Sequence, residues 1–254
     1  MLGRDLTRLA QEAGHEVRAM SRRPQPKQST PRMEWVQANL ETGEGLQAAL
    51  KNAEVVIHAA TSPFSRTAKI DVQGTRRVLE LARVAGIKHF IFPSIVGIEK
   101  IPFAYYQHKL AAEVVVRESG VPHTILRATQ FHSLLDKFLL LAARLPVLFL
   151  PVDFKYQPLH GREMAVRLIE CIVHGPAGRI ADLGGPQIHA FGEIANIWLQ
   201  AQGSHRKIFR LPLPGKTAQA FRRGDNTAPQ HAEGKVTWQE WVQFRYGSNY
   251  KKEK

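Results

Sequence analysis

Cysteine is nearly absent from this sequence, since Cys171 is the only one among 254 residues. No disulfide can form within the chain, so we expect a protein of a reducing compartment, the cytoplasm. Long apolar runs are also missing. The longest, Phe138 to Leu150, contains Arg144 and Pro146 and is too short to cross a bilayer. The N-terminus lacks the apolar core of a signal peptide. We therefore expect that a membrane is not a partner of this protein.

Runs of like charge are missing too, although the chain is basic overall. It has 35 Lys and Arg against 22 Asp and Glu, a formal net charge of +13. Such a charge attracts the phosphates of nucleic acids, cofactors and anionic lipids alike. The basic residues are scattered in pairs, without a long run and without a zinc-finger or RNA-binding signature. His160 has no second ligand at metal spacing. We expect neither specific nucleic-acid binding nor a metal site.

The sequence does contain an alternation of apolar runs with helical segments. Strands separated by helices of about ten or more residues indicate right-handed crossovers and a parallel sheet. We therefore expect an α/β protein with a Rossmann-like, doubly wound sheet. The expected strands are Glu16–Met20, the region of Trp35 and Val36, Val55–Ala60, His89–Phe92, His123–Leu126 and Ile180–Leu183. The expected helices are about Leu2–Ala13, Leu46–Leu50, Lys69–Ala85, Tyr105–Glu118, Arg162–Val173, Ile194–Leu199 and Trp238–Phe244.

The alternation is regular up to about residue 150 and looser afterwards. We predict a Rossmann-like dinucleotide-binding domain over residues 1–150. Residues 151–254 are expected to form a small C-terminal α/β substrate lobe that packs on the first domain as one unit. No polar cluster in this lobe indicates the class of substrate.

The chain opens on a helix rather than on the first strand of such a sheet. Apolar residues recur at helical spacing from Leu2, and Gly14 follows as a C-cap. In a doubly wound fold, a glycine-rich turn before this helix binds a pyrophosphate. We interpret Gly3 as the last glycine of that turn, where helix and strand pack closely. Between a start placed too late and a true truncation we favour the first, because losing a central strand unpairs two buried edges.

Two arginines follow the second strand of the expected fold. Arg22 lies 19 residues after Gly3. In such folds the residue that contacts the cofactor ribose lies about 20 residues after the glycine-rich turn. NAD-specific sites place Asp or Glu there, whereas Arg22 and Arg23 suit the 2′-phosphate of NADP. A solvated basic loop is the alternative. The pattern favours NADP, with NADPH preferred over NADH.

Tyr105 and Lys109 are four residues apart, so a helix places them on one face. Ser94 ends the preceding predicted strand. In reductases, a Tyr hydroxyl gives a proton to the substrate oxygen, a nearby ammonium lowers the pKa of that hydroxyl, and a Ser hydroxyl orients the carbonyl. We assign these catalytic roles to Tyr105, Lys109 and Ser94. Tyr106 is an alternative donor.

At these residues the chain resembles the NmrA-like branch of the atypical short-chain dehydrogenases/reductases, which are NAD(P)H-binding proteins. The resemblance runs from Gly3 to about Trp241. It rests on the segments His89–Gly97, Tyr105–Glu113, Thr124–Phe131, Gln157–Leu159 and Asp182–Pro186. The first two glycines of the Gly-x-x-Gly-x-x-Gly pattern of the family are not in this sequence.

The resemblance implies that further residues contact the cofactor. They are Asn39 and Leu40 beside the adenine, Ala59, Ala60 and Thr61 along the pyrophosphate and nicotinamide ribose, Lys109 on that ribose, and Gln130 and Phe131 at the nicotinamide end.

Three functions are compatible with this pattern. The leading hypothesis is an NADPH-dependent oxidoreductase acting on a small carbonyl or quinone-like substrate. The alternative is a non-catalytic sensor that binds NADP and a protein partner, because the branch includes both kinds. Sugar-nucleotide epimerisation requires tightly held NAD, which Arg22 and Arg23 disfavour. His58 is interpreted as a core histidine, and His132 either faces a substrate pocket or packs in the interior. A homodimer is compatible with such a fold.

Overall fold

The computed structural model describes residues 2–24, 33–62 and 68–247. Contacts divide the chain into two compact units. Unit 1 consists of Met1–Ser94, Ala104–Leu126 and Met164–Ile180, and unit 2 consists of Ile95–Phe103, Arg127–Glu163 and Ala181–Lys254. The units therefore interleave along the sequence, whereas the sequence analysis placed one boundary at residue 150. The periodicity of a segment reports its local structure, but it does not reveal that a later segment returns to an earlier sheet.

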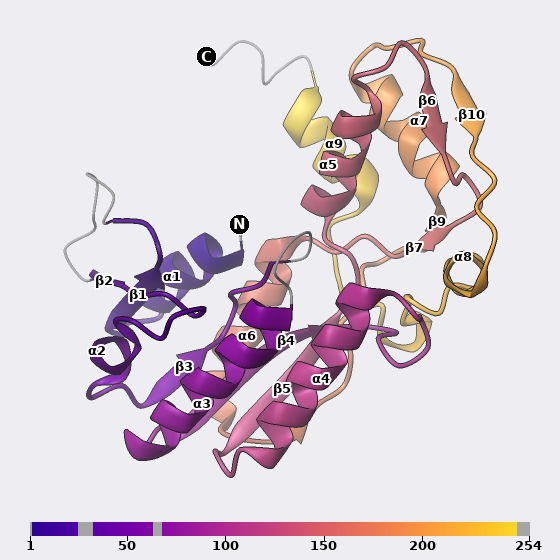
Figure 1. Cartoon of the computed structure of the whole chain (residues 1–254). Coiled ribbons are helices and arrows are strands. Elements are labelled where there is room, and N and C mark those ends of the chain that lie inside the picture. The colour runs from indigo at the N-terminus through magenta and orange to yellow at the C-terminus, as the bar shows by residue number, and fades with distance from the viewer. Residues whose placement is uncertain (1, 25–32, 63–67, 248–254) are drawn as a thin grey trace. The chain divides into compact units, whose positions relative to one another are not determined.

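Unit 1 alternates strands with helices, as predicted (Figure 1). The elements that lie wholly or mostly in it are α1 (Leu2–Glu12), β1 (Val17–Ser21), β2 (Met33–Gln37), α2 (Leu46–Leu50), β3 (Val55–Ile57), the π-helical segment η1 (Ala68–Gly74), α3 (Thr75–Val84), β4 (His89–Ile95), α4 (Ala104–Glu118), β5 (His123–Ala128), α6 (Gly161–His174) and β8 (Gly178–Arg179).

The strands of unit 1 form two sheets. One has the order β3-β4-β5-β8, with β3 parallel to β4 and β5 parallel to β8. The other consists of β1 and β2, which are parallel. Among the described residues no strand pairs with both β1 and β3, so the single sheet that we expected is interrupted there. Figure 1 shows α3 and α4 on one face of the larger sheet and α6 behind it.

One predicted strand is misplaced. We expected a strand over Ile180–Leu183, but β8 ends at Arg179. The segment that follows still runs beside β5, since the Ile180 N–H donates to the carbonyl of Ile125 and Leu183 forms an isolated bridge with Ala128. Residues 180–183 thus still pair with β5, but the pairing is interrupted after Arg179. The apolar residues of the segment do not show where such an interruption falls.

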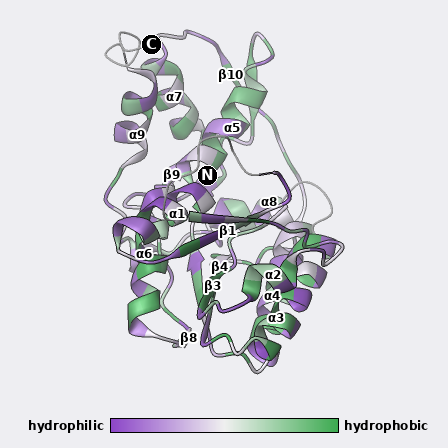
Figure 2. Cartoon of the chain, turned by 90° about the vertical axis from the view of Figure 1, so that its left-hand side faces the viewer, coloured by the Kyte–Doolittle hydropathy of each residue, from purple (hydrophilic) through white to green (hydrophobic). Residues whose placement is uncertain are grey.

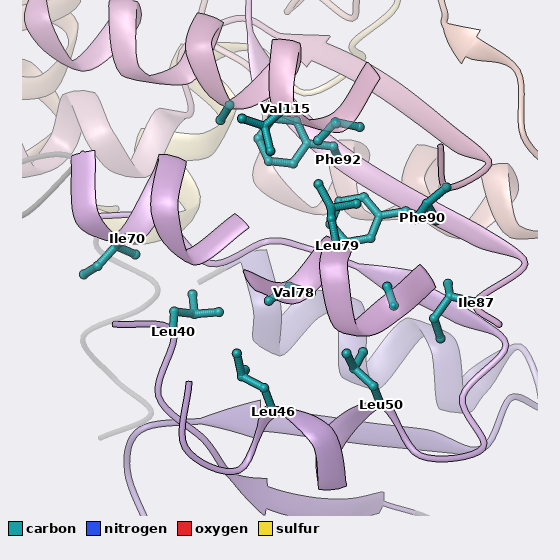
Figure 3. Packing of buried hydrophobic residues seen from close by; sticks show 14 of the residues in the cluster. Leu40, Leu46, Leu50, Ile70, Val78, Leu79, Ile87, Phe90, Phe92 and Val115 are labelled. Carbon is teal, nitrogen blue, oxygen red and sulfur yellow. The ribbon is translucent and has the colours of Figure 1, made fainter. Parts of the chain in front are cut away.

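The core of unit 1 lies between the larger sheet and its helices (Figure 3). Phe90, Ile91 and Phe92 are consecutive in β4 and all fully buried, as expected for a parallel strand covered on both faces. Val78 and Leu79 of α3 add to this core. Each such side chain contributes about 1.5–3 kcal/mol through burial. In Figure 2, α3, α4 and α6 carry hydrophilic and hydrophobic colours along their lengths, as expected for helices with one face on a sheet.

Unit 2 is built mainly from helices and short strands. They are α5 (His132–Ala142), β6 (Leu148–Leu150), β7 (Lys155–Tyr156), β9 (His189–Ala190), α7 (Phe191–Ala201), β10 (Ile208–Arg210), α8 (Lys216–Arg223), the 3-10 turn η2 (Pro229–His231) and α9 (Trp238–Tyr246). β6 pairs with β10 in parallel, and β7 pairs with β9 in antiparallel fashion. The core of unit 2 includes Trp198 and Trp238, whose indole N–H groups donate to Asp136 and to the carbonyl of Ile194.

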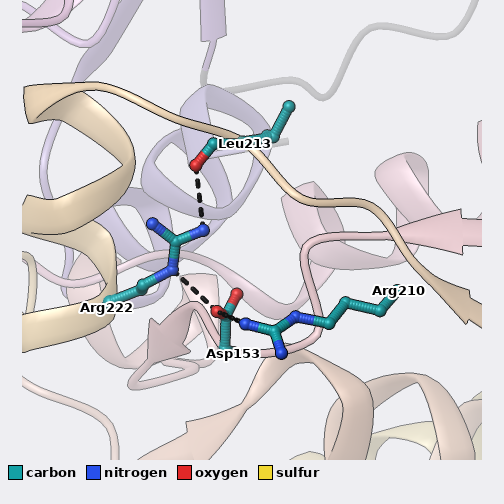
Figure 4. A network of polar contacts seen from close by, with 4 residues as sticks. All are labelled: Asp153, Arg210, Leu213 and Arg222. Atoms are coloured by element: carbon teal, nitrogen blue, oxygen red, sulfur yellow. Dashed lines mark hydrogen bonds and ion pairs between the residues drawn. The ribbon is translucent and has the colours of Figure 1, made fainter.

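An ionic network connects three segments of unit 2 (Figure 4). Asp153 Oδ2 accepts hydrogen bonds from Arg222 Nε at 2.7 Å and from Arg210 Nη2 at 2.9 Å. Arg222 Nη2 also donates to the carbonyl of Leu213 at 2.9 Å. Two guanidinium groups share one carboxylate, so the network joins β10 and α8 to the loop after β6 and keeps a positive charge.

Gly97 makes a close backbone approach within unit 2. Its φ is +84°, and a Cβ there would lie 2.1 Å from the carbonyl oxygen of Asp225. The positive φ and the close contact together mean that a residue with a side chain fits at position 97 only if the backbone shifts.

Candidate functional site

Several side chains assigned to the site lie at one end of the larger sheet of unit 1. Tyr105 and Lys109 are in α4, where their spacing places them on one face. Ser94 lies next to the last residue of β4, and Thr61 follows the end of β3. Ligands of open α/β folds bind outside the carboxyl ends of parallel strands. We therefore examine these strand ends and α4 as the candidate active site.

A chain of hydrogen bonds connects Tyr105 to a buried carboxylate. Thr61 Oγ1 donates to Asp71 Oδ1 at 2.5 Å, and the Ser62 N–H donates to Asp71 Oδ2 at 3.0 Å. The hydroxyl oxygen of Tyr105 lies 3.0 Å from Thr61 Oγ1. Thr61 has one hydroxyl proton and gives it to Asp71, so Tyr105 is the donor to Thr61. Asp71 is 1% exposed and anchors the chain.

The pKa of Tyr105 follows from this environment. Burial raises it to about 12, and the negative charge of Asp71 acts in the same direction, while the hydrogen bond with Thr61 opposes both. The phenol is therefore protonated at neutral pH, which is the state that a proton donor needs. We had expected Lys109 to lower this pKa. The direction is the opposite, because the phenol is half-buried and lies one hydroxyl away from a carboxylate.

Lys109 is buried, with its ammonium at the end of β4. Nζ donates to the carbonyl of Pro93 at 3.0 Å and lies 4.0 Å from the centre of the Phe92 ring. Burial lowers the pKa of Lys109 to about 8, while the charges of Asp71 and Glu113 oppose that shift. At neutral pH the amine is mostly protonated. The Pro93 carbonyl and the Phe92 ring hold this ammonium group close to Ser94 in the sequence, because Pro93 directly precedes Ser94.

Ser94 presents an unused hydroxyl at this position. The residue is 6% exposed, and its Oγ has no hydrogen-bond partner among the described residues. A buried hydroxyl without a partner costs about 1–3 kcal/mol. This position therefore fits a ligand oxygen that forms the missing hydrogen bond.

His58, directly after β3, belongs to the support of the site. Its Nε2 lies 3.1 Å from Thr75 Oγ1, and the Thr75 hydroxyl donates to the carbonyl of Asp71 at 2.7 Å. The imidazole Nε2 is then the donor, because Thr75 has already given its proton. Burial lowers the pKa of His58 to about 3, so the ring is neutral. It is a hydrogen-bonded core histidine, as expected.

The residues at these strand ends fit a nicotinamide cofactor. The free hydroxyl of Ser94 is available to a ligand, and Ala60 and Thr61 are exposed after β3. Arg22 and Arg23 are exposed after β1 and have no carboxylate partner in the described part of the chain. Side chains of β2 bind the backbone carbonyls of both arginines, at 3.2 and 3.1 Å. These bonds fix the backbone of both residues at the end of a strand, and the two exposed guanidinium groups that it carries can bind a phosphate.

The comparisons with known proteins agree with this fit. Residues 1–134, just over half of the chain, match a family described as NAD(P)H-binding. This chain belongs to that family. The match confirms the resemblance to atypical short-chain dehydrogenases/reductases that the motifs indicated, and it establishes a nicotinamide-binding, oxidoreductase-like fold.

The known proteins that resemble this chain include two of similar sequence and one solved structure of similar fold. The photosystem II assembly factor Ycf39 of Trieres chinensis is 23% identical over 223 residues, 84% of this chain and 69% of that protein. The ceramide reductase of Caulobacter vibrioides is 28% identical over 227 residues, 84% of this chain and 71% of the reductase. The structure of the NADPH-dependent quinone oxidoreductase QOR2 of Escherichia coli, complexed with NADPH, superposes with a TM-score of 0.81 at 17% identity, over 97% of this chain and 96% of that one.

The residues assigned to the adenine end lie in a tight turn after β2. Asn39 Oδ1 accepts a hydrogen bond from the N–H of Glu41 at 2.9 Å. Leu40 is buried in the core of unit 1, as Figure 3 shows. Their side chains therefore stabilise the turn itself, and contact with the adenine stays a prediction. Ala59 follows β3 directly, and its N–H donates to the carbonyl of Ile57.

Gly3 does not make the contact that we expected. It is exposed in α1, and a Cβ on it would meet no atom within 4 Å. The predicted close packing of helix on strand at this glycine is wrong for the described chain, because no strand lies against it.

Gln130 and Phe131 belong to unit 2. Gln130 Oε1 accepts from Asn226 Nδ2 at 3.1 Å, and its Nε2 donates to the carbonyl of Asn226 at 3.3 Å. Both ends of this buried amide are thus bound to one residue. Phe131 is the N-cap residue of α5 and forms an isolated bridge with Leu159. Their assignment to the nicotinamide end stays a prediction.

The sequence analysis missed Asp71, the buried carboxylate at the end of the hydrogen-bonded chain from Tyr105. Its signal was an acidic residue between the apolar Ile70 and Val72, ahead of the helix that begins at Thr75. A charged residue flanked by core residues needs partners, but the partners come from the loop after β3 and were not visible in the spacing.

Two features are absent from the part of the chain that the structure describes. None of the helices in that part is both long enough and apolar enough to span a membrane. Nor does that part contain a group of three or more metal-ligating side chains. Cys171 is buried in α6, and burial raises the pKa of its thiol, so the thiolate is disfavoured.

Proposed function

We propose that this protein is an NADPH-dependent oxidoreductase acting on a small carbonyl or quinone-like substrate. One observation carries the proposal. A protonated phenol and a buried ammonium lie on one face of α4, and the unpartnered hydroxyl of Ser94 lies at the end of β4. These are the three groups that carbonyl reduction requires, and the fold supplies the nicotinamide-binding framework.

The preference for NADP rests on the two arginines after β1. Arg22 and Arg23 suit a 2′-phosphate, and no carboxylate stands at either position to bind the ribose hydroxyls of NAD. The solved structure of the quinone oxidoreductase with NADPH supports this preference by analogy of fold.

The roles of the residues follow from their positions. When bound, a reduced nicotinamide supplies the hydride for this chemistry. Tyr105 gives its hydroxyl proton to the substrate oxygen, for which the hydroxyl must leave Thr61. Ser94 donates a hydrogen bond to the same oxygen. Lys109 binds the nicotinamide ribose, and its charge stabilises the phenolate that proton transfer leaves behind.

Loss of NADPH absorbance tests the activity, with a soluble quinone and a small aldehyde as substrates. We expect Tyr105→Phe to lower turnover about 100-fold or more while NADPH still binds. Tyr106→Phe is the matched control, because it removes a hydroxyl from the neighbouring residue, and we expect full turnover. Full turnover in the Tyr105 variant together with loss in the Tyr106 variant would transfer the donor role to Tyr106.

Fluorescence titration with NADPH and with NADH tests the cofactor preference. We expect the double variant Arg22→Gln/Arg23→Gln to lose NADPH affinity about tenfold or more, since charge-assisted bonds to a phosphate contribute about 1.5–3 kcal/mol each. Its NADH affinity should not change. Lys51→Gln/Arg83→Gln removes two exposed charges elsewhere in unit 1 and serves as the control. An equal loss of affinity for NADPH and for NADH would contradict the proposal that Arg22 and Arg23 bind the 2′-phosphate.

A non-catalytic NADP-binding regulator is the second candidate. It is favoured by the hydrogen bond that already engages Tyr105 and by the likeness to a protein named as an assembly factor. Intact NADPH binding without turnover of any carbonyl or quinone would decide for the regulator.

A further inference from the structure

Unit 2 has an exposed apolar surface around the β6–β10 pair. Phe149 of β6 and Phe209 of β10 are register partners, and their rings stack with centroids 5.7 Å apart. They are 50% and 47% exposed. In Figure 1 the two strands lie side by side within unit 2. Exposed aromatic pairs of this kind contribute little to the core, because their outer faces remain in water.

The turn after α5 extends this surface. The guanidinium of Arg206 donates to the carbonyls of Ala143 and Leu145, and the N–H of Leu148 donates to the carbonyl of Lys207. These bonds hold residues 143–148 against the segment that leads into β10. Leu141 and Leu145 are both more than half exposed, so this turn adds exposed aliphatic side chains to the same part of unit 2.

Basic residues predominate in the two chain segments around this surface, which are bounded by Asp136 and Asp153 and by Glu193 and Asp225. Residues 137–152 contain Lys137 and Arg144 but no Asp or Glu. Residues 194–224 contain seven Lys, Arg or His residues and again no Asp or Glu. Arg144 and Lys207 have no carboxylate partner among the described residues. Asp153 neutralises part of the charge of Arg210, but this one carboxylate is shared with Arg222.

We propose that the β6–β10 surface, defined by Leu141, Arg144, Leu145, Phe149, Lys207 and Phe209, docks on an anionic lipid bilayer. Phe and Leu side chains enter the boundary between headgroups and acyl chains, while the basic residues between them bind lipid phosphates. The aliphatic residues favour a lipid over a nucleic acid, since Leu141 and Leu145 offer no ring on which a base could stack. This attachment needs no membrane-spanning helix, and it is independent of the proposed reductase activity.

Co-sedimentation of the full chain with vesicles tests the proposal. One set contains phosphatidylcholine alone, and the other contains equal parts of phosphatidylcholine and phosphatidylglycerol. We expect binding to the anionic vesicles that weakens with added salt. Phe149→Ser/Phe209→Ser should weaken it about tenfold or more. Arg144→Gln/Lys207→Gln should weaken it about 25-fold, or about fivefold for each basic residue lost.

Matched controls separate a defined surface from the overall positive charge. Lys51→Gln/Arg83→Gln removes the same charge from unit 1, and Val84→Ser removes an exposed apolar side chain from α3. Both should bind vesicles like the parent. Equal losses in the controls and in the surface variants would overturn the proposal, as would the absence of binding to either vesicle.

Two further measurements identify other occupants of the surface. Binding of a DNA duplex that both surface variants lose, without vesicle binding, would assign the surface to nucleic acid and refute the proposal. A dimer in sedimentation velocity that Phe149→Ser/Phe209→Ser converts to a monomer, again without vesicle binding, would assign it to self-association.

Discussion

Replacing Asp71 with asparagine keeps the shape of a buried side chain and removes its negative charge. In the native protein this carboxylate accepts bonds from the Thr61 hydroxyl and the Ser62 N–H. The asparagine carbonyl can still accept from Thr61, but its amide group then meets the Ser62 N–H as a second donor. The variant therefore loses one charge-assisted hydrogen bond and leaves a donor unsatisfied.

The magnitude follows from these losses. A hydrogen bond to a charged group contributes about 1.5–3 kcal/mol, and the bond to Thr61 becomes an ordinary neutral one. Lys109 also loses a charge that raises its pKa. We expect the free energy of unfolding to fall by about 2–4 kcal/mol. Burial, the main cause of the raised pKa of Tyr105, is unchanged in the variant, but the smaller contribution of the Asp71 charge is lost, so this pKa should fall below its parent value of about 12.

Two assays follow these effects. Urea unfolding, monitored by tryptophan fluorescence, gives the change in stability. Alkaline absorbance titration, with Tyr105→Phe as the reference, isolates the phenolate of Tyr105. Glu80→Gln removes an exposed charge from α3 and is the control. If the Asp71 variant matched this control in stability and Tyr105 titrated as in the parent, the hydrogen-bonded chain would not exist as described.

Three more predictions concern pH and packing. Lys109 loses its proton near pH 8 when folded and near 10.5 when unfolded, so the stability of the parent should rise with pH across that window. Urea unfolding should show a rise of about 2 kcal/mol between pH 8 and pH 10 for the parent and none for Lys109→Met. Burial and, to a smaller extent, the neighbouring His160 lower the pKa of His132 to about 3 from an ordinary 6.5. The parent should thus lose stability as pH falls through that range, and His132→Phe should lose less when both are unfolded at pH 7 and 4. Gly97→Ala should lower the unfolding free energy by about 3 kcal/mol or more, whereas Gly175→Ala, with φ +77° and open space, should cost only about 1 kcal/mol; thermal melting distinguishes them.

The elements of unit 1 could be predicted because two of its strands are apolar runs that alternate with helices, and the β4 run is fully buried at its centre. Val55–Ile57 and His89–Phe92 are nearly continuous apolar runs between helices, and that pattern has few alternatives. Unit 2 offered no such signal, since β7 and β9 are two residues long. Strands of that length are set by their neighbours and not by their own composition.

The site was predictable only where its residues share one element. Tyr105 and Lys109 are linked by helical spacing, which the sequence displays. The bond between Thr61 and Tyr105 joins residues 44 positions apart, and Gln130 binds a partner 96 positions away. No local pattern encodes such pairs, so neither the raised pKa of Tyr105 nor the buried amide pair of Gln130 could be foreseen.

The interleaving of the two units has a practical consequence for dissecting the protein. The chain passes from one unit to the other after Ser94, Phe103, Leu126, Glu163 and Ile180, so no single cut yields either unit whole. A fragment that ended at the limit of the family match, residue 134, would lack α6 and β8 and would leave β5 as an unpaired edge open to aggregation. Limited proteolysis should therefore release no stable half. Dissecting the two units by truncation is ruled out, and point substitutions in the intact chain are the way to assign functions to each.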